Sequence, residues 1–153
     1  MSAEDELNRR HITLPPPPRP VATYRTSVLV GNMLYVSGHG PAAAEGVKTT
    51  GKLGKDLSVE EGSRSARQTG LNILATVRDA LGTLDRVERV VKLLGFVSCV
   101  PEFADQPKVI NGCSDLFVEV FGDDKGKGTR SAVGTNALPG NIATEVEAIF
   151  LVR

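Results

Sequence analysis

The sequence has no tryptophan and only two cysteines and two histidines among its 153 residues. Cys99 and Cys113 lie in apolar stretches and form no CxxC pair or Cys/His ligand spacing. We therefore expect buried free thiols, and neither a disulfide nor a metal site.

Net charge is also lacking, because 18 basic residues balance 18 acidic ones. Without an overall positive field, nucleic acid is not an expected partner, since phosphate contacts supply most of the affinity for it. No apolar run approaches the roughly 18 residues of a membrane span, and the N-terminal "MSAEDELNRRH" is too polar for a secretory signal. We expect a soluble cytoplasmic protein with no membrane partner.

The common catalytic signatures are missing as well. No GxSxG element supports a serine nucleophile, and "GKLGKD" lacks the spacing of a phosphate-binding loop. His11 lies in a polar N-terminal stretch where a functional role is not expected. His39 in "SGHGP" fits either an ordinary hairpin end or a segment whose glycines let the backbone approach a ligand.

The length and the 41% hydrophobic content suit one domain with a single core, which we place at residues 21–153. Residues 1–20 end in "LPPPPRP" and form a proline-rich arm with polyproline II geometry. Such an arm is either a ligand for a proline-recognising domain or a stiff segment laid on its own protein.

Turn and capping signals mark the first elements of the domain. The runs "YRTSVLV" and "MLYVSG" flank Gly31-Asn32 and predict a β-hairpin. Ser58 lies three residues before Glu61, which is the capping-box spacing, and an apolar stripe then predicts a helix over 59–81 that ends at Gly82.

The remaining elements follow from composition. Many β-branched residues predict a buried strand over 88–99, and apolar three- and four-residue steps predict a second helix over 103–121. Two strands, 131–135 and 144–150, are expected to pair as a hairpin about Leu138-Pro139-Gly140. The predicted fold class is α+β, a mixed sheet with two helices on one face. Its other face needs cover from another subunit.

Arg130 is a charged residue between a glycine-rich loop and an apolar segment predicted to be a strand. In the predicted hairpin it lies opposite Glu145, within contact range of a cross-strand neighbour. The pair is either an ion pair at a sheet edge, or a pocket in which Arg130 binds a substrate carboxylate through two parallel hydrogen bonds. Spacing alone leaves both interpretations open.

Several of these stretches, in this order, carry a family resemblance: "YRTSVLVGNMLYVSGHGP", "KVINGCSDLFVEVFG", "TRSAVG", "ALP" and "EVEAI". Together they span about residues 20–153 and resemble the reactive-intermediate deaminase family, also called Rid, YjgF or endoribonuclease L-PSP. The resemblance implies a chorismate-mutase-like fold. It also implies a homotrimer with a central barrel and ligand clefts between subunits.

The resemblance further implies a deaminase that hydrolyses 2-imino or 2-enamino acids to 2-oxo acids and ammonia, without metal or cofactor. Arg130 takes the position that binds the substrate carboxylate, and Glu145 the position that places the hydrolytic water. The implied substrate-binding positions are Tyr24, Ser37, Gly38, His39, Asn111 and Ala132. The chain departs from the family pattern in "ATY" for GPY, "SGH" for SGQ, Ala132 for a cysteine and a longer segment after the hairpin.

Two alternatives belong to other functional classes. The first alternative is a non-catalytic binder of small carboxylate metabolites or a regulatory protein, because a cleft can bind ligands without turning them over. The third possibility, an endoribonuclease, is disfavoured by the balanced charge.

Overall fold

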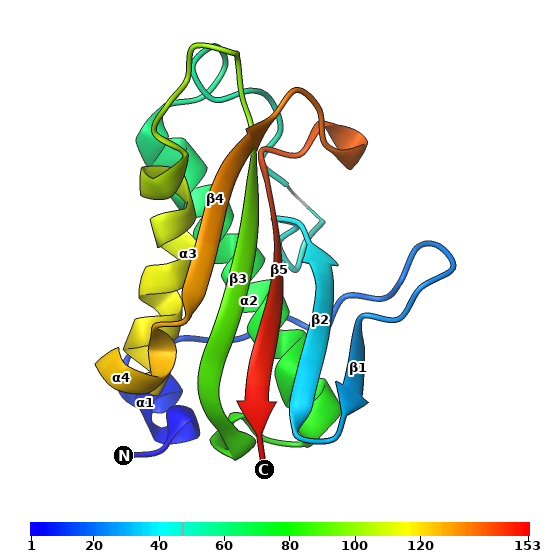
Figure 1. Cartoon of the computed structure of the whole chain (residues 1–153), viewed down its shortest axis with the longest axis vertical. Coiled ribbons are helices and arrows are strands. Elements are labelled where there is room, and N and C mark those ends of the chain that lie inside the picture. Colours follow the sequence, from blue (N-terminus) through cyan, green and yellow to red (C-terminus); the bar gives the residue numbers. More distant parts are fainter. Residues whose placement is uncertain (47) are drawn as a thin grey trace.

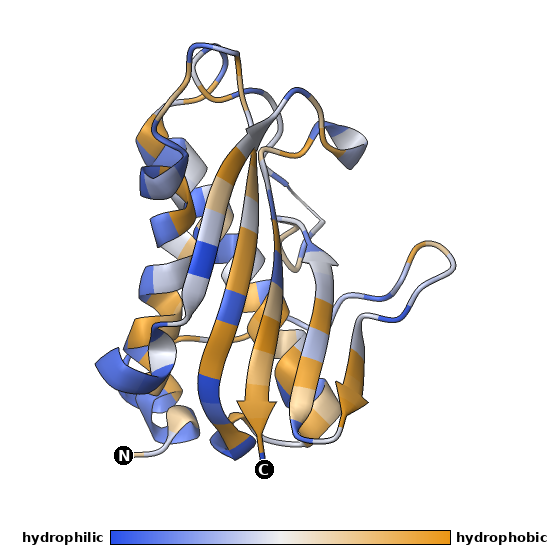
Figure 2. Ribbon diagram, in the orientation of Figure 1, coloured by the Kyte–Doolittle hydropathy of each residue, from blue (hydrophilic) through white to orange (hydrophobic). Residues whose placement is uncertain are grey.

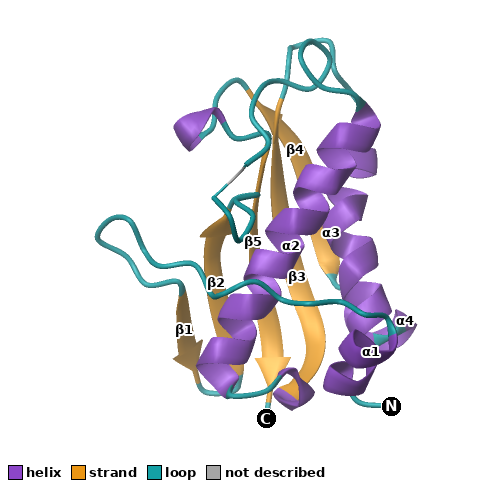
Figure 3. Ribbon diagram, turned by 180° about the vertical axis from the view of Figure 1, so that it is seen from behind, coloured by secondary structure: helices purple, strands orange, loops and turns teal. Residues whose placement is uncertain are grey.

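The computed structural model describes residues 1–46 and 48–153 and forms two layers. A five-stranded sheet has the order β1-β2-β5-β3-β4, and the helices α2 and α3 cover one of its faces (Figures 1 and 3). The strands are β1 (Ser27–Val30), β2 (Met33–His39), β3 (Val87–Ser98), β4 (Thr129–Thr135) and β5 (Thr144–Val152). The helices are α1 (Ala3–Arg9), α2 (Val59–Leu81), α3 (Gln106–Phe121) and the short α4 (Asp123–Gly126). The expected α+β sheet with helices on one face is confirmed.

Helix α2 begins and ends where its sequence signals indicate. The Ser58 hydroxyl accepts the amide of Glu61 at 3.2 Å, and the Glu61 carboxylate accepts the amide of Ser58 at 3.1 Å. Gly82 ends the helix with a φ of 84°, a left-handed conformation that glycine adopts without a Cβ penalty. No helix in the described part of the chain is long and apolar enough to cross a bilayer.

Helix α3 starts at Gln106, three residues later than predicted, because Pro107 fits the first turn, where its missing amide costs nothing. Inside this helix, Gly112 marks its closest approach to α2. A Cβ built on Gly112 would lie 1.9 Å from the backbone oxygen of Ser63. The missing side chain therefore sets how tightly the two helices pack.

Gly112→Ala is accordingly expected to destabilise the fold, although alanine favours helices by itself. Forcing the helices apart costs about 1–3 kcal/mol, which lowers the Tm by roughly 3–10 °C for a chain of this size. Thermal unfolding followed by circular dichroism measures the effect. Asp115→Ala, on the exposed side of the same helix, is the matched control and should change the Tm little. An unchanged Tm in Gly112→Ala would contradict the close packing.

The sheet confirms one predicted hairpin and contradicts the other. β1 and β2 pair antiparallel about Gly31-Asn32, as expected. β4 does not pair with β5; it runs parallel to β3, and β3 separates it from β5. The prediction of a β4–β5 hairpin was therefore wrong. The twelve-residue β3 is an interior strand with a hydrogen-bonded partner on each side, and the chain after β4 crosses its end to reach the far side.

The N-terminal residues include a helix that the sequence reading missed. α1 packs on α3, and Leu7 reaches the main core with 1% of its surface exposed. The Glu4 carboxylate accepts two hydrogen bonds from Arg78 and one from the amide of Leu84. The chain then runs across the outer side of α2 toward β1 (Figure 3). The sequence of this helix is mostly polar and has no apolar stripe, because Leu7 is its only fully buried side chain. The sequence pattern therefore did not indicate a helix here.

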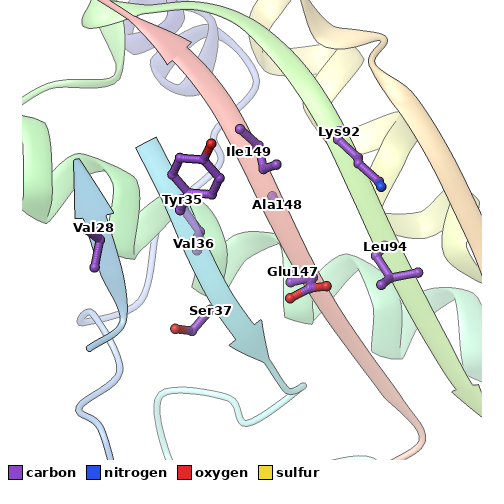
Figure 4. A pocket seen from close by; sticks show the side chains of 9 residues that line it. All are labelled: Val28, Tyr35, Val36, Ser37, Lys92, Leu94, Glu147, Ala148 and Ile149. Atoms are coloured by element: carbon purple, nitrogen blue, oxygen red, sulfur yellow. The ribbon is translucent and has the colours of Figure 1, made fainter. Parts of the chain in front are cut away.

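The second face of the sheet carries no helix (Figures 1 and 3), and the strands β1, β2 and β5 are largely apolar (Figure 2). Val28, Tyr35, Ile149 and Lys92 form one row of register partners across four strands. Figure 4 shows this row beside Glu147, where the side chains line a shallow hollow of about 360 Å³. Val28 and Tyr35 are each nearly half exposed, so this face has the composition of a contact surface.

Candidate functional site

The predicted site residues fall into two separate groups. The first lies where β2 ends against β5. Val36 pairs with Ala148 and His39 with Val146, so Ser37 and Gly38 together oppose the single residue Glu147 and form a β-bulge. The Ser37 hydroxyl donates a hydrogen bond to the carbonyl oxygen of Arg25 at 2.5 Å, and the Ser37 amide donates to the carbonyl oxygen of Thr26 at 3.0 Å. These bonds hold the segment with the exposed Tyr24 beside the bulge.

Glu145 on β5 lies directly against this bulge. A Cβ built on Gly38 would come within 2.9 Å of Glu145 Oε2. Any side chain at position 38 would therefore displace the Glu145 carboxylate. Burial, and secondarily the charge of Glu147, raises the pKa of Glu145 above its ordinary value. No hydrogen bond to this carboxylate comes from residues 1–46 or 48–153. It is therefore available to a water molecule or a ligand, and its raised pKa means that it holds a proton more tightly than a free carboxylate does.

The raised pKa also makes Glu145 a cost to folding. Because the folded protein holds the proton more tightly than the unfolded chain, stability falls as pH rises from the unfolded pKa toward the folded one. Glu145→Gln is expected to match the wild-type Tm in acid and to exceed it by a few degrees above the folded pKa. Thermal melts between pH 4 and 8 measure this. Glu88→Gln, at an exposed site, is the control, and a Tm for Glu145→Gln that is lower at pH 8 would contradict the assignment.

His39 holds the end of the bulge from the opposite side of the sheet. Its Nδ1 donates to the carbonyl of Ser37 at 2.6 Å, so its Nε2 accepts from the hydroxyl of Thr76 at 2.7 Å. The side chain is buried, and burial lowers the pKa of His39, which favours the neutral ring. Both ring nitrogens are thus occupied. His39 is positioned to support the bulge, and it also lines a small cavity beside Gly38. Its expected role at the rim of a cleft stays a prediction.

The second group lies on the edge strand β4 and on α3. Nη1 of Arg130 donates to Oδ1 of Asn111 at 2.7 Å and to Oγ of Ser114 at 3.1 Å. No acidic partner for Arg130 occurs within the described ranges, and its Nε and Nη2 make no hydrogen bond there. These two atoms form the side of the guanidinium that binds a carboxylate through parallel hydrogen bonds. Ala132 lies two residues further along the strand and packs partly against the core.

Within one chain the two groups are far apart. Arg130 is in register with Leu93, a residue buried under the helices, whereas Glu145 is in register with Phe96 on the other face. β3 separates the two residues, so they lie two strand spacings apart sideways, about 10 Å, and three residues apart along the strands. The cross-strand contact that the sequence predicted for Arg130 and Glu145 was therefore wrong.

Two supporting residues escaped the sequence reading. Ser114 follows Asn111 by three residues, a helical spacing that could have indicated their shared contact with Arg130. Thr76 lies 37 residues from His39, and no local pattern connects them.

Both cysteines are buried free thiols, as predicted, and burial raises the pKa of Cys113 to about 12. Across residues 1–46 and 48–153, no group of three side chains is suited to holding a metal ion.

The fold and the two residue groups define an α+β protein with an exposed guanidinium on the edge strand β4 and a partly buried carboxylate on the middle strand β5. A family model described as "YjgF/chorismate mutase-like, putative endoribonuclease" matches residues 5–149. The chain belongs to this family.

Three relatives illustrate the range of the family. Protein TCP17 of Trypanosoma cruzi is 44% identical over 94% of this chain and 89% of its own length. A 2-iminobutanoate/2-iminopropanoate deaminase of Dermatophagoides farinae is 29% identical over 95% of this chain and 98% of its own. The crystal structure of Atu1372 from Agrobacterium tumefaciens, a protein of unknown function, is 40% identical. It superposes with a TM-score of 0.89 over 99% of this chain and 92% of that one.

Proposed function

We propose that the protein is a homotrimeric deaminase that hydrolyses 2-imino and 2-enamino acids to 2-oxo acids and ammonia. The observation that carries the proposal is the guanidinium of Arg130, which leaves Nε and Nη2 unoccupied within the described residues while Asn111 and Ser114 hold Nη1. A 2-imino acid supplies the planar carboxylate that such a fork binds. The related deaminase of Dermatophagoides farinae supports the reaction type.

The proposed reaction needs positioning and one acid–base group. Arg130 holds the carboxylate of a protonated imine, and Glu145 takes a proton from the water whose oxygen adds to the carbon of the C=N bond, which gives a neutral carbinolamine. Glu145 then passes this proton to the nitrogen, the C–N bond breaks as the C=O bond forms, and the hydroxyl proton leaves on the ammonia as ammonium. One water is consumed, and one 2-oxo acid and one ammonia are released. The raised pKa of Glu145 suits both proton transfers.

The separation of Arg130 and Glu145 within one chain has a direct consequence for this mechanism. A substrate of a few atoms cannot touch both residues of the same copy, so we place the site between two copies. One copy contributes Arg130, Asn111 and Ala132, and its neighbour contributes Tyr24, the Ser37-Gly38 bulge and Glu145. The exposed apolar sheet face provides the surface through which three copies associate.

An imine-decay assay tests the activity. An amino-acid oxidase generates 2-imino acids in situ from several amino acids, and the lifetime of each imine is measured with and without the protein. We expect shorter lifetimes with at least one side chain and a trimeric mass in solution. Unchanged lifetimes with every side chain would exclude the deaminase, and an unchanged lifetime combined with tight binding of 2-oxo acids would favour a non-catalytic binder.

A further inference from the structure

A second cavity, of about 200 Å³, adjoins the Ser37-Gly38 bulge. It lies between the end of β2, the segment before β1 and the loop that precedes β5. Its apolar walls come from Pro18, Pro41, Ala42 and Ile142, and its polar lining comes from Tyr24, Thr26, His39, Lys48 and Asn72. It does not include the residues of the open sheet face in Figure 4.

Gly38 connects this cavity to the proposed reaction centre. The glycine lines the cavity, and the place of its missing side chain lies 2.9 Å from Glu145 Oε2. A substrate held with its reacting carbon beside Glu145 therefore has this hollow within reach of its side chain. Since one water occupies about 30 Å³ of liquid, the volume accommodates a side chain of several non-hydrogen atoms.

The polar groups of the cavity differ in whether they are already used. The Asn72 amide donates to the carbonyls of Gly40 and Ala42 at 2.9 and 2.8 Å, and His39 is bound to Ser37 and Thr76. In contrast, the hydroxyls of Tyr24 and Thr26 and the ammonium of Lys48 have no hydrogen-bond partner among residues 1–46 and 48–153. These three groups can all donate.

The charge distribution of the cavity favours a negatively charged ligand group. Lys48 is its only lining residue, among those described, with a permanent charge, and no acidic residue lines it. The Lys48 ammonium lies 3.0 Å from the position of a Cβ built on Gly140, so it sits over the loop that leads into β5. An apolar channel with free donors and a cation fits a short aliphatic chain that ends in an anion.

From this we infer that the cavity receives the side chain of a 2-imino acid carrying a second carboxylate, with Lys48 as the residue that selects it. The inference rests on the proposed function for the first carboxylate and for the reaction. It adds a substrate class, the 2-imino dicarboxylic acids.

Substrate preference tests the inference. The kcat/KM for the imine of glutamate is compared with that for the imine of norvaline, which has the same chain length without the charge. The wild type is expected to prefer the glutamate imine, and Lys48→Met, which removes an exposed ammonium, to reduce this preference about two- to fivefold. Lys48→Glu should reverse it. Lys55→Met, an exposed lysine outside the cavity, is the control. A ratio that Lys48→Met leaves unchanged would overturn the inference.

A binding measurement separates this inference from the proposed reaction. Glutarate and pentanoate, which both offer one carboxylate to Arg130, are titrated into the wild type and into Lys48→Met, with NMR shifts as the readout. Tighter binding of glutarate that is lost in Lys48→Met supports the cavity assignment even if no imine is hydrolysed. Equal affinities for the two acids in the wild type would overturn it, whatever the fate of the deaminase proposal.

Discussion

Arg130→Ala is expected to lower kcat/KM for imine hydrolysis by about 100- to 10 000-fold, because each of two charge-assisted hydrogen bonds contributes roughly 1.5–3 kcal/mol. The effect follows from where the guanidinium lies. Asn111 and Ser114 fix Nη1, so the unoccupied side of the fork is already oriented before a substrate arrives. Initial rates of imine decay across substrate concentrations measure the loss.

Two further variants show that the loss comes from the fork and not from misfolding. Arg130→Lys keeps the charge without the planar pair of donors and should recover only part of the activity. Arg89→Ala removes an arginine of the neighbouring β3 that binds Asp124, and it should leave turnover unchanged. Because Arg130 is exposed, its alanine variant should retain a Tm close to that of the wild type. Full activity in Arg130→Ala would remove this residue from the site.

Mixing two inactive variants is expected to restore activity. Arg130→Ala and Glu145→Gln each disable every cleft of a homotrimer. In every trimer that contains both variants, however, one cleft in three receives Arg130 from one copy and Glu145 from its neighbour. Co-expression with two different affinity tags isolates these mixed trimers, and their activity should approach a third of the wild-type value.

The mixed assemblies distinguish a shared site from a site within one chain. If both residues acted from the same copy, no cleft of a mixed assembly would hold an intact pair, and activity would stay at the level of the separate variants. The double variant Arg130→Ala/Glu145→Gln, co-expressed with the wild type, is the matched control. The placement of Arg130 and Glu145 on opposite faces, with β3 between them, is the structural reason to expect restoration.

Local signals in the sequence determined most of the elements. The capping box at Ser58 and the terminating Gly82 defined α2 to the residue, and Gly31-Asn32 placed the first hairpin. Strand order was not accessible in this way, because pairing depends on contacts between distant segments. Consecutive strands usually pair, but β5 lies between β2 and β3 and not beside β4, which breaks that expectation.

Motif resemblance proposes Arg130, Glu145 and the Ser37-Gly38 pair as candidate site residues, but it does not give their arrangement. The spacing argument that brought Arg130 and Glu145 together relied on the wrong hairpin. The bulge, the support of His39 by Thr76 and the position of Lys48 over Gly140 all depend on long-range packing. No period or spacing in the sequence encodes these contacts.

The most direct measurement of the proposed activity is the first-order rate constant for decay of 2-iminobutanoate as a function of protein concentration. The proposal predicts that the constant rises in proportion to the wild-type protein and remains at the buffer value with the folded Arg130→Ala/Glu145→Gln double variant. A constant that stays at the buffer value at every concentration of folded wild-type protein would contradict it.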